Sequence, residues 1–97
     1  MVPIEWTKED AEILKRACRY FYVRRKRTRR SLKMVAAEAH ISTEMLKSIE
    51  QGRFQEVDLK SFYRLCRYYY VLPHQLLTGS FHTDSYSDSI FREIKEK

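Results

Sequence analysis

Apolar side chains recur every three or four residues along most of this chain, a spacing typical of amphipathic α-helices. The first such segment has Thr7 at the position of a helix cap and Asp10 at the reciprocal position of a capping box. It continues to about Lys26, and its core-facing positions are Leu14, Ala17, Cys18 and Phe21. Because only two prolines and two glycines interrupt 97 residues, the pattern predicts an all-α fold.

Two short helices are expected next, separated by a tight turn. Ser31 caps the first of them, which ends near His40-Ile41, and Ser42 caps the second. The buried face of the first consists of Val35, Ala36 and Ala39, and that of the second of Leu46 and Ile49. The lengths and the turn have the proportions of a helix-turn-helix.

The rest of the pattern predicts a fourth helix, a fifth helix and a short tail. Asp58 caps the fourth helix, whose core positions are Leu59, Phe62, Leu65, Cys66 and Tyr69. Pro73 begins the fifth, which carries Leu76 and Leu77 and ends at Gly79. Residues 80–89 are rich in serine and aspartate and are expected to be a linker. A last helix from about Ser89 is too short to be stable alone.

The charge of the chain is concentrated at one place. Nineteen Lys and Arg against thirteen Asp and Glu give a net charge of +6. Residues 1–30 hold ten basic and four acidic side chains, whereas residues 31–97 hold nine of each. Six of the seven residues Arg24–Arg30 are basic, and such a block attracts a polyanion: nucleic acid, an anionic membrane or an acidic protein. A solvated helix end is the alternative.

Several classes of function lack the residues they need. No segment approaches the roughly 20 apolar residues of a membrane span, and no signal-peptide core follows Met1, so we expect a cytoplasmic protein without a membrane partner. The two cysteines and three histidines have no partners at metal-ligand spacing, and no catalytic constellation is present. We therefore expect no enzyme activity, no metal and no cofactor.

The stretch from Ser31 to Gly52 resembles the helix-turn-helix of the lambda-repressor/Cro family. The matching features are Ala36 where the helices approach, Ile41-Ser42 at the entry to the recognition helix, and the ending Glu50-Gln51-Gly52. His40 stands where the family usually has glycine, so this histidine is expected in a left-handed conformation. The apolar pattern of the family continues to about residue 78. The resemblance implies a five-helix DNA-binding domain over residues 1–79, with the motif at 31–50 and the recognition helix at 42–50, followed by a tail at 80–97.

The resemblance also assigns roles to side chains. In a helix-turn-helix the second helix lies in the major groove with its first residues at the base edges. The base-reading candidates are Thr43, Glu44, Lys47 and Ser48. The phosphate-binding candidates are Arg25, Arg29, Arg30, Ser31, Gln51 and Arg53. In family members an arginine at the position of Arg25 pairs with the glutamate matched here by Glu50, so we expect that ion pair as well.

These features favour a sequence-specific regulator that binds double-stranded DNA, a bacterial or phage repressor occupying a palindromic operator as a homodimer and associated with the nucleoid. The segment from Val71 to Leu77 resembles the dimer surface of the family. Apolar side chains of the tail are candidates for reinforcing it or for binding another protein: Phe81, Tyr86, Ile90, Phe91 and Ile94.

Two further interpretations remain open. An antitoxin has the same fold and binds its toxin through an added segment, a role that residues 80–97 would suit. RNA binding through the arginine-rich block is the third interpretation.

Overall fold

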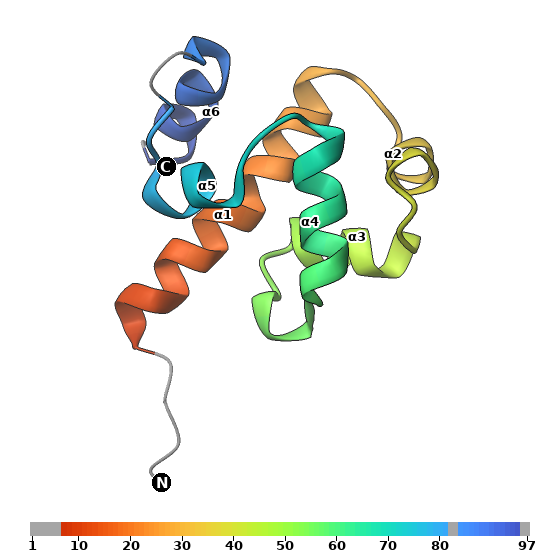
Figure 1. Cartoon of the computed structure of the whole chain (residues 1–97), viewed down its shortest axis with the longest axis horizontal. Helices are drawn as coiled ribbons and strands as arrows, with labels where there is room; N and C mark the ends of the chain where they lie inside the picture. The colour runs from red at the N-terminus through yellow and green to blue at the C-terminus, as the bar shows by residue number, and fades with distance from the viewer. Residues whose placement is uncertain (1–6, 82–83, 96–97) are drawn as a thin grey trace, which may run out of the picture.

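The computed structural model describes residues 7–81 and 84–95, which form six α-helices and one turn of 3₁₀-helix (Figure 1). No residue in these two ranges is in a β-strand, so the predicted all-α fold is confirmed. The helices are α1 (Lys8–Arg27), α2 (Leu32–Ala39), α3 (Thr43–Glu50), α4 (Leu59–Tyr68), α5 (Pro73–Thr78) and α6 (Ser85–Lys95), and η1 (Phe54–Glu56) lies between α3 and α4.

The predicted caps begin the first four helices. The Thr7 hydroxyl accepts a hydrogen bond from the Asp10 amide at 3.0 Å, and the Thr7 amide donates to the Asp10 carboxylate, which completes the capping box. Ser31, Ser42 and Asp58 each accept from the backbone amide three residues ahead. These bonds satisfy donors that the first turn of a helix cannot pair internally, so the four start points are encoded locally.

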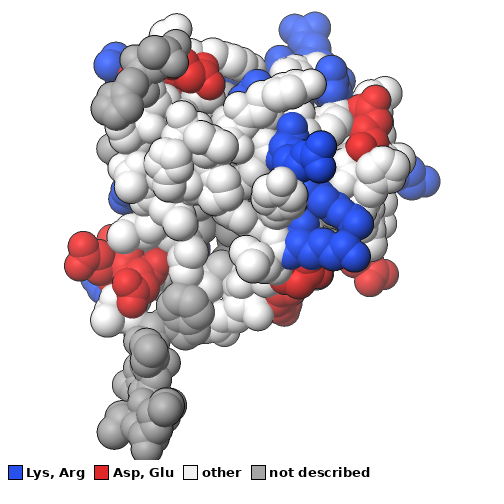
Figure 2. All heavy atoms as spheres, in the orientation of Figure 1, with Lys and Arg blue, Asp and Glu red and all other residues white. Residues whose placement is uncertain are grey.

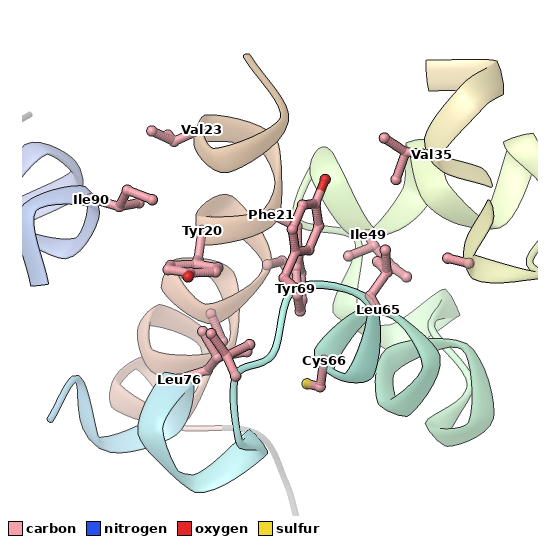
Figure 3. Close-up of a cluster of buried hydrophobic side chains, with 14 of the residues drawn as sticks. Tyr20, Phe21, Val23, Val35, Ile49, Leu65, Cys66, Tyr69, Leu76 and Ile90 are labelled. Atoms are coloured by element: carbon pink, nitrogen blue, oxygen red, sulfur yellow. The ribbon is translucent and has the colours of Figure 1, made fainter. Parts of the chain in front are cut away.

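Helix α1 lies at the centre, with α5 and α6 on one side and α2, α3 and α4 on the other (Figure 1). Tyr20 and Phe21, which are consecutive in α1, pack on opposite sides of the helix (Figure 3). Tyr20 packs against Phe81 and Phe91, with ring centroids 5.9 and 5.7 Å apart, and Phe21 packs against Phe62 and Tyr69 at 5.5 and 6.0 Å. The helix therefore buries a wider face than the predicted stripe, and Tyr20 and Val23 belong to the core.

The tail differs from its prediction. Helix α6 starts at Ser85 rather than near Ser89, because Asp84 accepts a hydrogen bond from the Ser87 amide at 3.0 Å and caps it. Serine and aspartate are common both in turns and at helix N-termini. In residues 80–89 they begin a helix. Phe81, Ile90 and Phe91 are buried against α1, so most of the apolar area expected to be free for a partner is used within the chain.

A chain of polar contacts joins α6 to α1. The Arg24 guanidinium donates to the Tyr20 hydroxyl, which is 2.7 Å from the buried Ser87 hydroxyl, and Ser87 is 2.6 Å from an Asp84 carboxylate oxygen. Because a guanidinium can only donate and a carboxylate can only accept, Tyr20 donates to Ser87 and Ser87 donates to Asp84. Burial alone would raise the pKa of Asp84, but the bonds from Ser87 and the charge of Arg24 hold it below its ordinary value.

Leu59, predicted in the core, is exposed instead, and so is Leu77 of α5. Leu59 is 83% exposed and Leu77 is 43% exposed. Leu59 is the first residue of α4, at the edge of an open apolar hollow of about 300 Å³ that Leu14, Phe62 and Leu77 also line. Helical spacing identifies the side of a helix that is apolar, but the neighbouring elements stop short of covering this end of α4.

Candidate nucleic-acid interface

Helices α2 and α3 pack together across a connection of three residues, His40, Ile41 and Ser42. His40 ends α2 with φ 60° and ψ 45°, the left-handed conformation expected at this position. The Ile41 amide donates to the Ala36 carbonyl at 3.0 Å and the His40 amide to Ala37 at 3.3 Å, so the turn is closed by backbone hydrogen bonds. Ala36 and Ala39 are buried, and their small side chains allow the two helices to approach closely. The two short helices expected within residues 31–50 and the tight turn between them are therefore present.

The four base-reading candidates all lie on α3, whose buried residues are Leu46, Ile49 and Glu50. Glu44 and Lys47 are exposed, and Thr43 and Ser48 are half-buried. The Ser48 hydroxyl donates to the Glu56 carboxylate at 3.1 Å, a contact with the η1 turn that the sequence pattern did not indicate. Of the four, Ser48 has a competing partner within the chain.

The expected ion pair between Arg25 and Glu50 is present. Arg25 donates from Nε to Glu50 Oε2 at 2.8 Å and from Nη2 to Oε1 at 2.9 Å, and the two side chains are only 13% and 4% exposed. Its third donor, Nη1, bonds the Arg30 carbonyl at 3.0 Å. Hydrogen bonding to Glu50 raises the pKa of Arg25. Arg25 is therefore a positioning residue that connects α1, the loop before α2 and the end of α3.

The other phosphate-binding candidates lie at the two ends of the α2–α3 unit. Arg29, Arg30 and Ser31 precede α2, and Gln51 and Arg53 follow α3. All five are exposed. Two of the arginines have acidic partners: Arg30 lies 3.6 Å from Glu38 and also bonds the Tyr68 hydroxyl, and Arg53 lies 3.8 Å from Glu56. Glu38 and Glu56 therefore offset part of the positive charge at this surface.

An open hollow beside α3 adds a residue that the sequence analysis missed. Its volume is about 440 Å³, and it is lined by Arg19, Tyr22, Arg25, Leu32, Lys47, Glu50 and Gln51. Arg19 is exposed and stacks over the Tyr22 ring, 4.5 Å from the centroid. Helical spacing indicated only that Arg19 points away from the core. Its place next to Lys47 follows from the packing of α1 on α3, which no local pattern encodes.

Four of the six cations in the basic block have side-chain partners within the fold. Arg24 is bonded to Tyr20, and its guanidinium lies over the Tyr69 and Tyr86 rings at 5.3 and 5.2 Å. Arg27 donates to Glu93 of α6 at 2.6 Å. Within the described ranges, only Lys26 and Arg29 of the six cations have no side-chain partner in the fold. The block is thus partly neutralised by α6, which the prediction of a linker did not anticipate.

The surface around α3 combines exposed cations and hydroxyls with a rigid scaffold. No model of a known protein family, no curated protein and no solved structure matches the chain. What the site can do therefore follows from its own chemistry. Guanidinium and ammonium groups bind phosphate oxygens, and the exposed polar side chains of a helix suit the edges of bases in a major groove.

Other chemistry is weakly represented in the described residues. None of them form a group of three or more metal-ligating His, Cys, Asp or Glu side chains. Burial raises the pKa of the Cys18 thiol to about 11 and that of the Cys66 thiol to about 12, so both remain protonated and poorly nucleophilic at neutral pH. None of the helices over 7–81 and 84–95 has the length and apolar character to cross a membrane.

Proposed function

We propose that this protein is a transcriptional regulator of the lambda-repressor/Cro type, which binds double-stranded DNA in a sequence-specific manner and represses by occupying an operator. The observation that carries the proposal is the unit of α2, a left-handed turn and α3, with the recognition helix fixed to α1 by the Arg25–Glu50 pair. A recognition helix must be rigid, since loose side chains discriminate poorly between bases.

In this proposal Thr43, Glu44 and Lys47 read base edges. Lys47 donates to guanine O6 or N7, Glu44 accepts from cytosine N4, and Thr43 contributes its hydroxyl or contacts a thymine methyl. Ser48 joins them when its bond to Glu56 is exchanged for one to DNA. Arg29, Arg30, Gln51 and Arg53 bind phosphates on either side of the groove, and Ser31 presents the N-terminus of α2 to the backbone.

We further propose that the protein binds as a homodimer through the exposed apolar residues near α5. Val71 and Leu76 are buried in the monomer, whereas Leu59, Leu72 and Leu77 are exposed. Leu59 and Leu77 line the same apolar hollow. A second copy is the simplest way to cover these side chains, and a two-fold dimer would require a palindromic site. Sedimentation of Leu77→Lys beside the parent protein tests the interface: the parent should be dimeric and the variant monomeric.

The packing of α6 favours a simple repressor over an antitoxin. An antitoxin segment must be available to its toxin, whereas α6 buries Ser87, Ile90 and Phe91 against α1. To bind a toxin in an extended form, the tail would have to give up these contacts. Fully burying a side chain of the size of Ile or Phe contributes about 1.5–3 kcal/mol, so release of the helix is costly.

Selection of bound sequences from a random duplex library tests the main proposal. A palindromic consensus is expected, and Thr43→Ala or Lys47→Ala should change the preferred base at one position of each half-site with a loss of about 1–3 kcal/mol. Arg92→Gln is the control, because Arg92 is exposed on α6, which lies across α1 from α3. Failure to enrich any sequence would refute specific DNA binding.

A further inference from the structure

Helix α4 carries a second basic surface that is separate from the recognition helix. Lys60, Arg64 and Arg67 are spaced by four and three residues, so they lie along one side of α4. Tyr63 and Tyr70 each follow one of these cations by three residues, which places them on the same side and at the C-terminal end. Ser61, Leu65 and Cys66 form the buried side. Figure 2 shows basic side chains gathered over the part of the molecule where Figure 1 draws α4.

The charges of this surface are only weakly offset. Residues Leu59–Tyr68 include no acidic side chain. Asp58, the N-cap of α4, is one nearby carboxylate, and Glu38, which accepts from the Tyr68 hydroxyl, is another. Hydrogen bonds from Ser61 chiefly lower the pKa of Asp58, and the charges of Lys60 and Arg64 add to the effect. Arg64 donates to the His40 carbonyl at 2.7 Å, and in the described part of the chain Lys60 and Arg67 form no ion pair.

The same surface exposes aromatic rings around a hollow. An open depression of about 780 Å³ lies between the end of α2, α4 and the start of α5, and its lining includes His40, Tyr63, Arg64, Arg67 and Tyr70. Tyr63 is 52% exposed and Tyr70 is 92% exposed. A tyrosine so exposed loses the apolar contacts that usually fix its ring.

Tyr70 is also held in an unusual backbone conformation. Its φ is 56°, in the left-handed region that glycine or asparagine normally occupies after a helix. Its amide donates to the Arg67 carbonyl and the Val71 amide to the Cys66 carbonyl. A bulky residue in this conformation costs stability, and its ring contributes almost no packing in return.

We infer that the α4 surface formed by Lys60, Tyr63, Arg64, Arg67 and Tyr70 binds single-stranded nucleic acid. The cations attract the phosphates, and the exposed tyrosines stack on unpaired bases, the combination that single-strand-binding proteins use. The site goes beyond the proposed reading of duplex DNA, because it uses a different helix and a different form of nucleic acid.

Other anionic partners fit the surface less well. In a duplex the base faces are stacked on each other, so the phosphates would satisfy the arginines and leave Tyr63 and Tyr70 without a partner. An acidic peptide would likewise pair with the cations but offer no planar group to the rings. Unpaired bases satisfy both kinds of side chain at once.

The test measures the binding of short fluorescently labelled oligouridylate and oligothymidylate by anisotropy. Tyr70→Gly should weaken single-strand binding about tenfold, whereas Tyr70→Phe, which keeps the ring, should bind as the parent does. Glycine tolerates the left-handed conformation, so Tyr70→Gly removes the ring without adding strain. The double variant Lys60→Gln, Arg67→Gln should also bind more weakly and with a smaller dependence on salt.

Controls separate this site from general attraction and from the α3 surface. Arg92→Gln changes the net charge on α6, which lies across α1 from α4, and should leave single-strand binding unchanged. Thr43→Ala should alter duplex selection alone, so this inference and the proposed function can fail independently. The inference is overturned if Tyr70→Gly binds single strands as tightly as the parent protein, or if polyglutamate binds more tightly than the oligonucleotides do.

Discussion

Arg25, in the last turn of α1, donates two hydrogen bonds to Glu50, and its remaining nitrogen bonds the Arg30 carbonyl. One side chain of α1 thereby fixes both the last residue of α3 and the loop that leads into α2. The sequence separation of Arg25 and Glu50 is 25 residues, so the pair closes a loop around the whole helix-turn-helix. Its function is to orient α3, because buried ion pairs contribute more to geometry than to net stability.

Removing one partner of this pair should therefore be more harmful than replacing both. Arg25→Ala leaves the Glu50 carboxylate buried without a counter-charge, and we expect it to lower the free energy of unfolding by about 3–5 kcal/mol and to weaken duplex binding with it. The double variant Arg25→Met, Glu50→Leu should recover much of the stability. Urea titrations of Arg25→Met, Glu50→Leu and the double variant give the coupling free energy of the pair. An Arg25→Ala protein with unchanged stability and affinity would contradict the orienting role.

Arg27 and Arg29 are two residues apart but should differ in DNA binding. Arg27 is paired with Glu93, so Arg27→Gln should cost about 0.2–1 kcal/mol of stability and change affinity little. Arg29 has no such partner within the described ranges, so Arg29→Gln should weaken binding to all duplexes similarly and lower the slope of log K against log salt by about 1. Titrations at several salt concentrations compare the two. If both variants lower the slope of log K against log salt equally, Arg27 contacts DNA as Arg29 does, despite its pairing with Glu93.

Acid should loosen α6 before the rest of the fold. The pKa of Asp84 is lower in the folded protein than in the unfolded chain. Its ionised carboxylate therefore contributes fully to stability above the ordinary aspartate pKa of about 3.9, and this contribution is lost as the pH falls through the pKa of the folded state. Hydrogen exchange of the α6 amides should therefore accelerate, after correction for the intrinsic rate, below about pH 4. In Asp84→Asn the exchange should be faster at neutral pH and should change less with acid. If the exchange rates of the two proteins depend on pH in the same way, titration of Asp84 is not what loosens α6.

The Tyr69 hydroxyl is buried and has no hydrogen-bond partner within the described structure. Burial is the largest cause of its raised pKa. Tyr69→Phe keeps the ring against Phe21 and removes the unpaired group, so stability should stay the same or rise by about 1 kcal/mol. Tyr69→Leu is the control that loses the ring and should destabilise. A loss above about 1 kcal/mol in Tyr69→Phe, measured by denaturant unfolding, would reveal a partner for the hydroxyl.

Glycine should be better than histidine at the turn of the helix-turn-helix. His40 has φ 60° and an exposed side chain, and a residue with a Cβ in this conformation costs about 1–2 kcal/mol. His40→Gly should raise stability by roughly 0.5–1 kcal/mol after the greater freedom of the unfolded chain is counted. His40→Ala keeps the Cβ and should give no gain. A thermal melt of the three proteins is sufficient, and a gain in His40→Ala equal to that in His40→Gly would show that strain is not the cause.

The local features of this fold could be predicted from the sequence because their causes are local. Thr7, Ser31, Ser42 and Asp58 cap helices through bonds that span three residues, and His40 was expected in the left-handed turn. The Arg25–Glu50 pair was predicted through the family resemblance rather than through spacing, since nothing local connects the two residues.

The features that could not be predicted depend on which helices meet. A count of charges over residues 31–97 gives zero and hides the basic side of α4. Leu59 follows the apolar pattern of α4 but lies where no neighbouring element covers it. The ion pair between Arg27 and Glu93 forms only when α6 folds onto α1. It was not predicted, because the Ser/Asp-rich composition of residues 80–89 indicated a linker.

The bond between Tyr20 and Ser87 joins residues that are 67 positions apart. During synthesis α1 is complete long before α6 exists, and at about 5–20 residues per second the delay lasts roughly 3–13 s. Until residues 84–95 have been made, α6 cannot cover the side of α1 that carries Tyr20. The folding of α6 thus determines when this side of α1 becomes buried.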